Sequence, residues 1–463
     1  MARATPFRPG TIYKALQHIF VPENFRYIRF NEEFELYNVR EVPIMFKVIV
    51  LGAGMVGSAI ARDLAQKHKV TLTDVSPGAL DKAVRRGTGS KNESINDPDR
   101  PSARIETRVL DVTDTRVLRD TVTSFDLVVS AVPGALGFRT LRTVIEAGRD
   151  IVDISFFREN ALDLNDLAVK NGVTAVVDCG VAPGMGNLLL GYHDARMAVT
   201  AFECLVGGLP AERRWPFSYK APFSPADVIE EYVRPARLVE NGRIVTREAL
   251  SDPELVDFDG IGTLESFNTD GLRTLIHTMS HIPDMKEKTL RYPGHIEYIR
   301  VLRACGFFSG EKVRVDDGTE VAPLALTSKL LFDQWRLGEE EEEFTVMRVS
   351  IEGTIHDQVS SGTETDRDDA GKIGKVRKDA DPAPGSARKR ITYDLLDRYC
   401  PKTRTSSMAR TTGYTATAVA NLLLENRFSE KGIIPPELIG RDETCFHYIM
   451  DYLTERGVNL TST

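Results

Sequence analysis

The sequence predicts an α/β fold with a doubly wound parallel sheet, followed by a second domain of the α+β class. Two observations support this prediction. From Phe46 onward, short apolar runs alternate with amphipathic segments, which is the pattern of parallel strands connected by helices. After Gly191 the apolar positions follow longer alternating runs, such as Ala201–Val206 and Thr345–Ile351, which are typical of an antiparallel or mixed sheet.

The elements of the first domain follow from these runs. A short apolar run bounded by turn residues predicts a buried strand, and an apolar stripe with a period of about 3.6 residues predicts a helix. The predicted strands are Lys47–Leu51, Val70–Asp74, Arg104–Val109, Leu127–Ala131, Ile151–Ile154 and Val173–Val177. The predicted helices are Val56–Gln66, Thr115–Val122, Arg139–Ala147 and Leu162–Lys170. Because 463 residues exceed what one core usually supports, we expect two domains.

Three segments are expected to lie outside these cores. Residues 1–44 mix aromatic and charged side chains without sustained periodicity, so they are interpreted as an N-terminal extension, either a packed arm or the result of an upstream translation start. Residues 355–390 are rich in Ser, Asp, Lys, Pro and Gly and cannot offset their ordering entropy by burial, so we expect a mobile polar insertion. The run Glu339–Glu343 is interpreted as a solvated linker or helix end, because like charges repel.

The composition limits the classes of partner that the chain is expected to bind. A net charge of −8 argues against nucleic-acid binding, which requires clustered basic residues, and favours a small-molecule partner. No apolar run reaches the roughly 18 residues of a membrane span, so we expect a soluble protein without a membrane partner. The N-terminus lacks the charged and apolar regions of a secretory signal, which favours a cytoplasmic location.

No metal site is expected. The five cysteines lie far apart, without a C-x-x-C pair, so reduced thiols are the simplest interpretation. His277 and His281 are four residues apart and could share a helical face, but neither the H-E-x-x-H pattern nor a third ligand is evident.

A glycine motif predicts a dinucleotide-binding site. G-x-G-x-x-G follows the first predicted strand directly and opens the first predicted helix. Gly52 permits a tight turn, Gly54 lets the backbone approach a pyrophosphate, and Gly57 allows the helix to pack closely on the strand. The helix N-terminus adds free amides and a partial positive charge. We therefore predict a Rossmann-like domain over residues 45–178. The residues expected to contact the cofactor here are Gly52, Gly54, Met55, Val56 and Gly57.

The end of the second predicted strand favours NAD. Asp74 lies about 20 residues after the glycines, where a carboxylate can accept hydrogen bonds from both ribose hydroxyls of the adenosine. A 2′-phosphate would be repelled by Asp74, and the residues that follow, Val75, Ser76 and Pro77, supply no compensating arginine. Two later strand ends are also expected to line the cofactor, on position alone: Asp111, Val112, Ala131, Val132 and Pro133.

Five segments carry a family resemblance. Val177–Asn187 contains a Gly-x-x-Pro-Gly core that resembles the strand-to-helix junction of the saccharopine-dehydrogenase-like superfamily. Phe217–Tyr232, Glu265–Leu275 and Thr289–His295 are similar to lysine 6-dehydrogenases. The final segment, which includes Arg410–Val419 and Lys431–Glu437, also resembles that superfamily. The resemblance runs from about Met45 to Val458. The N-terminal 44 residues and the two polar insertions, Gly87–Ser102 and residues 355–390, depart from the family pattern, which puts the oligomeric packing in doubt.

This resemblance implies both organisation and activity. It implies a substrate and oligomerisation domain over 179–407, a C-terminal return to the dinucleotide domain over 408–463, and a homodimer or larger homo-oligomer. The implied activity is NAD-dependent oxidative deamination of the ε-amino group of L-lysine, a reaction of lysine degradation. It gives 2-aminoadipate 6-semialdehyde, which cyclises to piperideine-6-carboxylate, and releases ammonia.

The reaction needs a proton acceptor and anchors for an amino acid. His193, just after the Pro183–Gly184 turn, has a near-neutral reference pKa and is the first candidate for the base, although a structural histidine on a helix surface is an equal alternative. Asp178, at a strand end, is the other candidate. The residues expected to bind the substrate are Asp153, Ser155, Tyr219, Lys220, Thr269, Asp270 and Arg273.

Two other functions stay open. A C–N bond-forming reductase of the same superfamily, such as saccharopine reductase or carboxynorspermidine dehydrogenase, would need several basic groups around a larger substrate, for which Lys220, Arg214 and Arg273 are candidates. Asp74 argues against a reductase that uses NADPH. A non-catalytic NAD-binding sensor is the third possibility, because a fold does not fix a function.

Overall fold

In a computed structural model of the chain, the structure describes residues 25–30, 33–38, 45–87, 105–316, 318–338, 340–355 and 388–463. The chain divides into two units, Met1–Met45 and Phe46–Thr463. In the first unit, β1 (Phe25–Phe30) pairs with β2 (Glu33–Asn38) in antiparallel register. The rest of the predicted extension over 1–44, and nearly all of the predicted insertion over 355–390, lie outside the described residues.

The predicted doubly wound parallel sheet is confirmed in the second unit. Its strands run in the order β19-β8-β7-β6-β3-β4-β5, and every pair is parallel. Their bounds are β3 Lys47–Leu51, β4 Lys69–Asp74, β5 Ile105–Val109, β6 Leu127–Ser130, β7 Ile151–Asp153, β8 Thr174–Val176 and β19 Gly432–Ile434. The strand order reverses between β3 and β6, and ligands of such sheets bind at this switch point, beyond the carboxyl ends of the strands.

Helices connect the parallel strands. Their bounds are α2 Met55–Leu64, α3 Pro77–Gly87, α4 Thr115–Val122, α5 Gly134–Glu146, the 3₁₀ helix η3 Ala161–Leu164 and α6 Asn165–Lys170. Asp114 caps α4, because its carboxylate accepts from the backbone amides of Arg116 and Val117. Helix α3 was not predicted, and α5 begins five residues earlier than predicted, directly after Pro133.

The second sheet is mixed and has nine strands. The main path is β11-β10-β14-β9-β17-β18-β20, with β13 paired to β14 and β12 paired to β13. Only β14 and β9 pair in parallel; the other pairs are antiparallel. The strands are β9 Met197–Pro210, β10 Ala236–Glu240, β11 Arg243–Arg247, β12 Glu254–Phe258, β13 Gly262–Asn268, β14 Asp284–Arg291, β17 Glu343–Ile355, β18 Arg388–Arg398 and β20 Leu460–Ser462. A separate hairpin joins β15 (Val313–Arg314) to β16 (Glu320–Val321).

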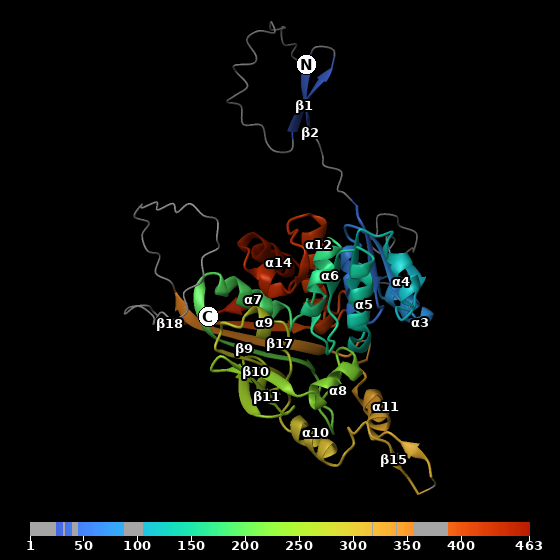
Figure 1. The fold of residues 1–463 in the computed structure, drawn as a ribbon, viewed down its shortest axis with the longest axis vertical. Coiled ribbons are helices and arrows are strands. Elements are labelled where there is room, and N and C mark those ends of the chain that lie inside the picture. The colour runs from blue at the N-terminus through green and yellow to red at the C-terminus, as the bar shows by residue number, and fades with distance from the viewer. Residues whose placement is uncertain are drawn as a thin grey trace. The chain divides into compact units, whose positions relative to one another are not determined.

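The helices of this part of the chain lie around the mixed sheet. They are α7 Met185–Asp194, α8 Pro225–Val233, α9 Leu275–Thr278, α10 His295–Ala304 and α11 Pro323–Trp335. In Figure 1 the long strands β9 and β17 run between α7 and α9 on one side and α8, α10 and α11 on the other. Helix α7 packs against both strands, and α11 packs on α8. The predicted α+β character of the second domain is therefore confirmed.

The C-terminal segment contacts both sheets. It comprises α12 (Ser407–Leu424), α13 (Pro436–Gly440) and α14 (Glu443–Glu455), and α12 packs on α2 and on α14. Strand β19 extends the parallel sheet, whereas β20 pairs with β18 of the mixed sheet. The boundaries at 178, 407 and 463 stay predictions, because the segment after 408 joins both sheets.

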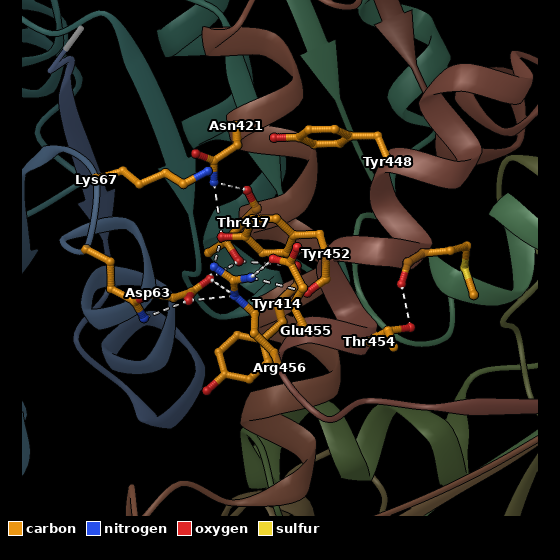
Figure 2. Close-up of polar contacts among 12 residues, drawn as sticks. Asp63, Lys67, Tyr414, Thr417, Asn421, Tyr448, Tyr452, Thr454, Glu455 and Arg456 are labelled. Carbon is orange, nitrogen blue, oxygen red and sulfur yellow. Dashed lines mark hydrogen bonds and ion pairs between the residues drawn. The ribbon is translucent and has the colours of Figure 1, made fainter. Parts of the chain in front are cut away.

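A buried carboxylate fastens this segment to α2. Asp63 of α2 accepts hydrogen bonds from the Thr417 hydroxyl at 2.6 Å, the Tyr452 hydroxyl at 2.7 Å and the Nε of Arg456 at 2.8 Å. Figure 2 shows these side chains converging on Asp63 from the two C-terminal helices and the chain just after them. Because Asp63 is 4% exposed, each of these bonds is made away from water.

One interpretation of the acidic run is corrected. Residue 339 is outside the described residues, but Glu343 begins β17 and is 2% exposed, so the prediction of a solvated run is wrong at that position. Its carboxyl group accepts from the Ser407 hydroxyl at 2.7 Å and from the Ser407 backbone amide. Burial raises the pKa of Glu343 to about 7. The residue thus supplies an acceptor for a free amide in the first turn of α12.

Candidate active site

The glycine-rich loop has the geometry that a dinucleotide requires. Gly52 has a φ of +100°, and a Cβ there would lie 2.5 Å from the carbonyl oxygen of Ala131. A Cβ on Gly57 would lie 1.9 Å from the carbonyl oxygen of Gly52, so α2 approaches the turn as only glycine permits. A Cβ on Gly54 would meet no atom within 4 Å, which leaves this side of the backbone open to a ligand. Helix α2 begins at the next residue, Met55, with its free amides directed to the same place.

Asp74 lies beside this loop at the end of β4. Its carboxylate accepts from the backbone amides of Ala53 and Ser76, both at 2.8 Å. These two bonds fix the carboxylate between the glycine turn and the start of α3. A carboxylate oxygen accepts more than one hydrogen bond, so Asp74 can still receive the hydroxyls of a ribose.

A cavity of about 520 Å³ begins at this loop and reaches the mixed sheet. This volume lies in the usual range for small-molecule sites. The turns after β3, β6, β7 and β8 contribute to its lining, as do β9, β14, α8 and the first turns of α12. The sequence-predicted residues that line the cavity are Gly52, Gly54, Met55, Val56, Gly57, Asp74, Ala131, Val132, Pro133, Ser155, Asp178 and Thr269.

Beyond Asp74, the charged lining of the cavity is mainly acidic. Among the described residues, its other titratable side chains are four carboxyl groups and one guanidinium: Asp178, Asp227, Glu231, Glu287 and Arg291. Burial raises the pKa of each of the four carboxyl groups, and that of Glu287 to about 8. A buried site with this excess of acid favours a cationic ligand over an anionic one.

Asp178 is held by a buried arginine. It follows β8 with a φ of +54°, and its Oδ1 accepts from the Nε of Arg273 at 2.6 Å. Arg273 also donates to the carbonyl oxygen of Phe157 and lies over the Phe156 and Phe157 rings. Burial raises the pKa of the Asp178 carboxyl, and the Arg273 charge opposes that rise. Because Arg273 does not line the cavity, it positions Asp178 rather than contacting a ligand.

Arg291 is the cation of the cavity. Its Nε donates to the Tyr232 hydroxyl at 3.1 Å, and its Nη2 donates to Glu231 at 2.7 Å and to the Tyr219 hydroxyl at 3.4 Å. The guanidinium lies 4.4 Å from the centre of the Tyr219 ring. This packing holds the side chain in one orientation, which suits an anchor for a carboxylate.

The structure does not bring His193 to the cavity. Its Nε2 lies 2.9 Å from the Tyr393 hydroxyl of β18, and its ring packs against Tyr192 and Tyr393. Burial lowers the pKa of His193 to about 4, so the ring is neutral at physiological pH. His193 lies away from the cavity because it is near the end of α7, about 12 Å along the helix axis from the first residue of the helix, Met185.

Four predicted substrate residues have structural partners instead. Lys220 donates to the carbonyl oxygens of Gln334 and Arg336 at the end of α11, where it stabilises the helix C-terminus. Asp270 forms a two-bond ion pair with Arg237. Tyr219 contacts Arg291, as described above. Asp153 is fully buried beneath Ser155, whose hydroxyl donates to it at 2.8 Å, and burial raises its pKa to about 7.

Two positional predictions for the cofactor also lie outside the cavity lining. Asp111 and Val112 follow β5 at the edge of the sheet. The Asp111 carboxylate accepts from the amide and the hydroxyl of Thr113, at 2.9 and 2.7 Å, and these bonds lower its pKa. Asp111 therefore shapes the turn after β5.

Asp227, Glu231, Glu287 and Arg291 were not predicted from the sequence. A spacing signal was nevertheless present for both pairs. Glu287, Thr289 and Arg291 alternate along β14, and all three line the cavity while the residues between them do not. Polar residues at every second position of a strand with buried surroundings indicate one functional face. Glu231 and Asp227 lie four residues apart on α8 and share a face in the same way.

Two kinds of feature are absent from the described residues. In the described parts of the chain, no group of three or more His, Cys, Asp or Glu side chains is arranged to hold a metal ion. The described helices include none with the length and apolar composition of a membrane span.

The sequence matches two family models. Residues 48–176 match the saccharopine dehydrogenase NADP binding domain, and residues 180–458 match the saccharopine dehydrogenase C-terminal domain. The chain is 25% identical over 277 residues to the NADP(+), L-glutamate-forming saccharopine dehydrogenase of Schizosaccharomyces pombe, and 26% identical over 289 residues to that of Saccharomyces cerevisiae. The matches cover 57% and 59% of this chain, and only 58% and 60% of the two relatives.

A plant protein and a solved structure are also similar. The alpha-aminoadipic semialdehyde synthase of Arabidopsis thaliana is 29% identical over 330 residues, which cover 63% of this chain and 30% of that protein. The apo saccharopine dehydrogenase (L-Glu forming) from Saccharomyces cerevisiae superposes with a TM-score of 0.66 at 18% identity, over 90% of this chain and 99% of that one. This structural likeness shows a shared fold.

Proposed function

This chain belongs to the saccharopine dehydrogenase family, and from that premise we propose that it is an NAD-dependent oxidoreductase that deaminates the ε-amino group of L-lysine. The overall change converts the ε-ammonium of lysine, NAD⁺ and water into 2-aminoadipate 6-semialdehyde, ammonium, NADH and one proton. The semialdehyde cyclises to piperideine-6-carboxylate.

The main support for the proposal is the charge of the side chains that line the cavity. The lining has four carboxyl groups besides Asp74 and one guanidinium among the described residues. Lysine has two ammonium groups and one carboxylate, which match this balance. Saccharopine carries additional carboxylates from its glutamate part, and these would face carboxyl groups of which, in the described part of the chain, only Asp178 and Glu231 are paired to an arginine, which costs free energy.

The loop after β3 supports a nicotinamide dinucleotide as the cofactor. Gly52 and Gly57 are packed so closely that a Cβ would collide with backbone, while the space over Gly54 is open to a pyrophosphate. When bound, the nicotinamide would supply the hydride acceptor for the substrate carbon. Asp74 favours NAD, because its carboxylate can accept the ribose hydroxyls and would repel a 2′-phosphate.

Side chains of the cavity can bind and orient the amino acid. Arg291 would anchor the α-carboxylate, and Glu231, which is paired to Arg291, would receive the α-ammonium. Asp178 is the proposed proton acceptor, because it lines the cavity at the carboxyl end of β8 and its pKa is raised by burial. Arg273 holds Asp178 in position.

Product analysis tests this proposal. Purified protein is incubated with L-lysine and NAD. The products are separated by chromatography and identified by mass spectrometry, and ammonium is measured enzymatically. We expect equal amounts of ammonium and piperideine-6-carboxylate. A product that still contains the ε-nitrogen would contradict the proposal.

The names of the relatives favour a second candidate function, oxidative cleavage of saccharopine with NADP. This alternative predicts glutamate and the semialdehyde from saccharopine, without ammonium. The same separation of products distinguishes the two reactions, because glutamate is formed in one and ammonium in the other.

A further inference from the structure

Glu287 differs from the other cavity acids in having no protein partner for its carboxyl group. Arg273 pairs with Asp178, Arg291 pairs with Glu231, and Asp227 is bonded to Ser224 and to the backbone of Gly134. For Glu287, the described residues provide neither a hydrogen bond nor an ion pair to the side chain, although the residue is 4% exposed. Burying a carboxyl group without a hydrogen-bond partner costs free energy, unless a ligand supplies that partner.

The space that Glu287 occupies is set by a glycine. A Cβ built on Gly271 would lie 1.9 Å from Oε1 of Glu287 and 2.7 Å from Oε2. Both residues line the cavity, and the carboxyl group lies against the bare backbone of residue 271. This arrangement fixes an acid in the cavity wall rather than in the surrounding core.

The neighbours of Glu287 determine which part of a ligand it meets. Its first charged neighbour is Asp178, the acid at the end of β8 where the parallel sheet meets the cavity. Arg291 lies four residues further along the same face of β14, about 13 Å away along the strand. An amino acid whose carboxylate is held at Arg291 could therefore extend its side chain along this face toward Glu287 and Asp178.

We infer that Glu287 is a specificity-determining residue that pairs with the distal ammonium group of the substrate. This inference deepens the proposed function and rests on it for the identity of the substrate as lysine. A distal ammonium would stabilise the ionised form of this carboxyl group, whose pKa is raised by burial, whereas a distal carboxylate would not. Glu287 thus selects a primary diamino acid against a substrate whose amine bears a second carboxylated arm.

Ligand binding without turnover tests the inference. The dissociation constants of L-lysine and L-norleucine, which lacks the distal ammonium, are measured by calorimetry on the full chain without cofactor. For the wild-type protein we expect lysine to bind at least about 10-fold more tightly than norleucine, as a charge-assisted bond provides. In Glu287→Gln this preference should fall to within about twofold, while norleucine affinity is unchanged.

Two further variants make the result decisive. Gly271→Ala keeps every charge but displaces the Glu287 carboxyl group, so it should reduce the preference for lysine as Glu287→Gln does. Glu297→Gln changes an exposed glutamate of α10 and should keep the wild-type preference. If Glu287→Gln still binds NAD, the variant is folded. If it does not bind NAD, the preference of Gly271→Ala for lysine over norleucine tests the inference instead.

The outcomes separate this inference from the proposed function. A wild-type protein that binds norleucine as tightly as lysine, or a Glu287→Gln variant that keeps the preference, overturns the role of Glu287. A preference that is lost in Glu287→Gln, combined with no NADH formation from lysine, supports Glu287 as the ammonium-binding residue and overturns deamination as the reaction.

Discussion

Replacement of Asp63 by alanine should loosen the C-terminal helices from the dinucleotide-binding sheet. Asp63 accepts from Thr417, Tyr452 and Arg456, and the Arg456 side chain is 14% exposed. In Asp63→Ala the two hydroxyls and the guanidinium lose an acceptor in a place that water reaches poorly. The cost arises mainly from the unpaired groups rather than from the bonds themselves.

The size of the effect follows from the kind of contact. Breaking a buried ion pair by removing one partner costs about 3–5 kcal/mol. A unit of this size has an unfolding entropy of roughly 0.9 kcal/mol/K, so the loss corresponds to a decrease in Tm of about 3–6 °C. Tyr452→Phe removes one donor to Asp63 and leaves the ion pair, so it should cost only about 1 kcal/mol.

Urea denaturation followed by circular dichroism measures the change in stability. Hydrogen exchange then locates it: the amides of α12 and α14 should lose protection, whereas those of α10 should not. Asp451→Asn, which changes an exposed aspartate of α14, is the matched control and should leave both measurements unchanged. A loss below about 1 kcal/mol in Asp63→Ala would refute the view that this carboxylate fastens the segment.

Three further predictions concern the cofactor, the base and pH. Asp74→Ser removes the charge that repels a 2′-phosphate, so the ratio of kcat/KM for NADP to that for NAD should rise at least about 10-fold in paired assays; an unchanged ratio would show that Asp74 does not select the cofactor. Asp178→Asn should lower kcat at least about 100-fold, whereas His193→Ala, outside the cavity, should stay within about threefold; the reverse order would identify His193 as the base. Because burial raises the pKa of Glu343 to about 7, the native chain holds a proton between about pH 4.5 and 7 that the unfolded chain releases. The contribution of Glu343 to stability therefore falls by about 3 kcal/mol as the pH rises through this window, and Glu343→Gln should remove that decrease in urea titrations; an equal slope in both proteins would contradict the assignment.

The parts of the site that are local in sequence were predictable. Gly52, Gly54 and Gly57 occur within six residues, and Asp74 ends the next strand, so strand, turn and helix patterns suffice to place them together. The same is true of six of the seven strands of the parallel sheet and of most of its helices, whereas β19 was not predicted as a strand. Their burial makes the apolar runs continuous, which is the clearest signal that a sequence carries.

The substrate-binding part of the site was only partly predictable, because it is formed by contacts between residues that are far apart in the sequence. Asp178 and Arg273 form an ion pair across 95 residues, and the sequence suggested both without suggesting that one positions the other. Lys220 was a plausible anchor by its charge, yet the fold uses it to stabilise the end of α11. The cavity is acidic because α8, β14 and the turn after β8 meet in the fold. The spacing of residues in the sequence does not indicate that these three elements come together.

Initial rates of NADH formation at 340 nm test the central claim most directly. The purified chain is assayed with L-lysine and with saccharopine, each with NAD and with NADP, at matched concentrations. We expect turnover of lysine with NAD, and a kcat/KM for saccharopine at least about 10-fold lower, because that substrate brings carboxylates to a cavity lined by four carboxyl groups besides Asp74. Turnover of saccharopine with NADP, in a protein that is silent on lysine, would contradict it.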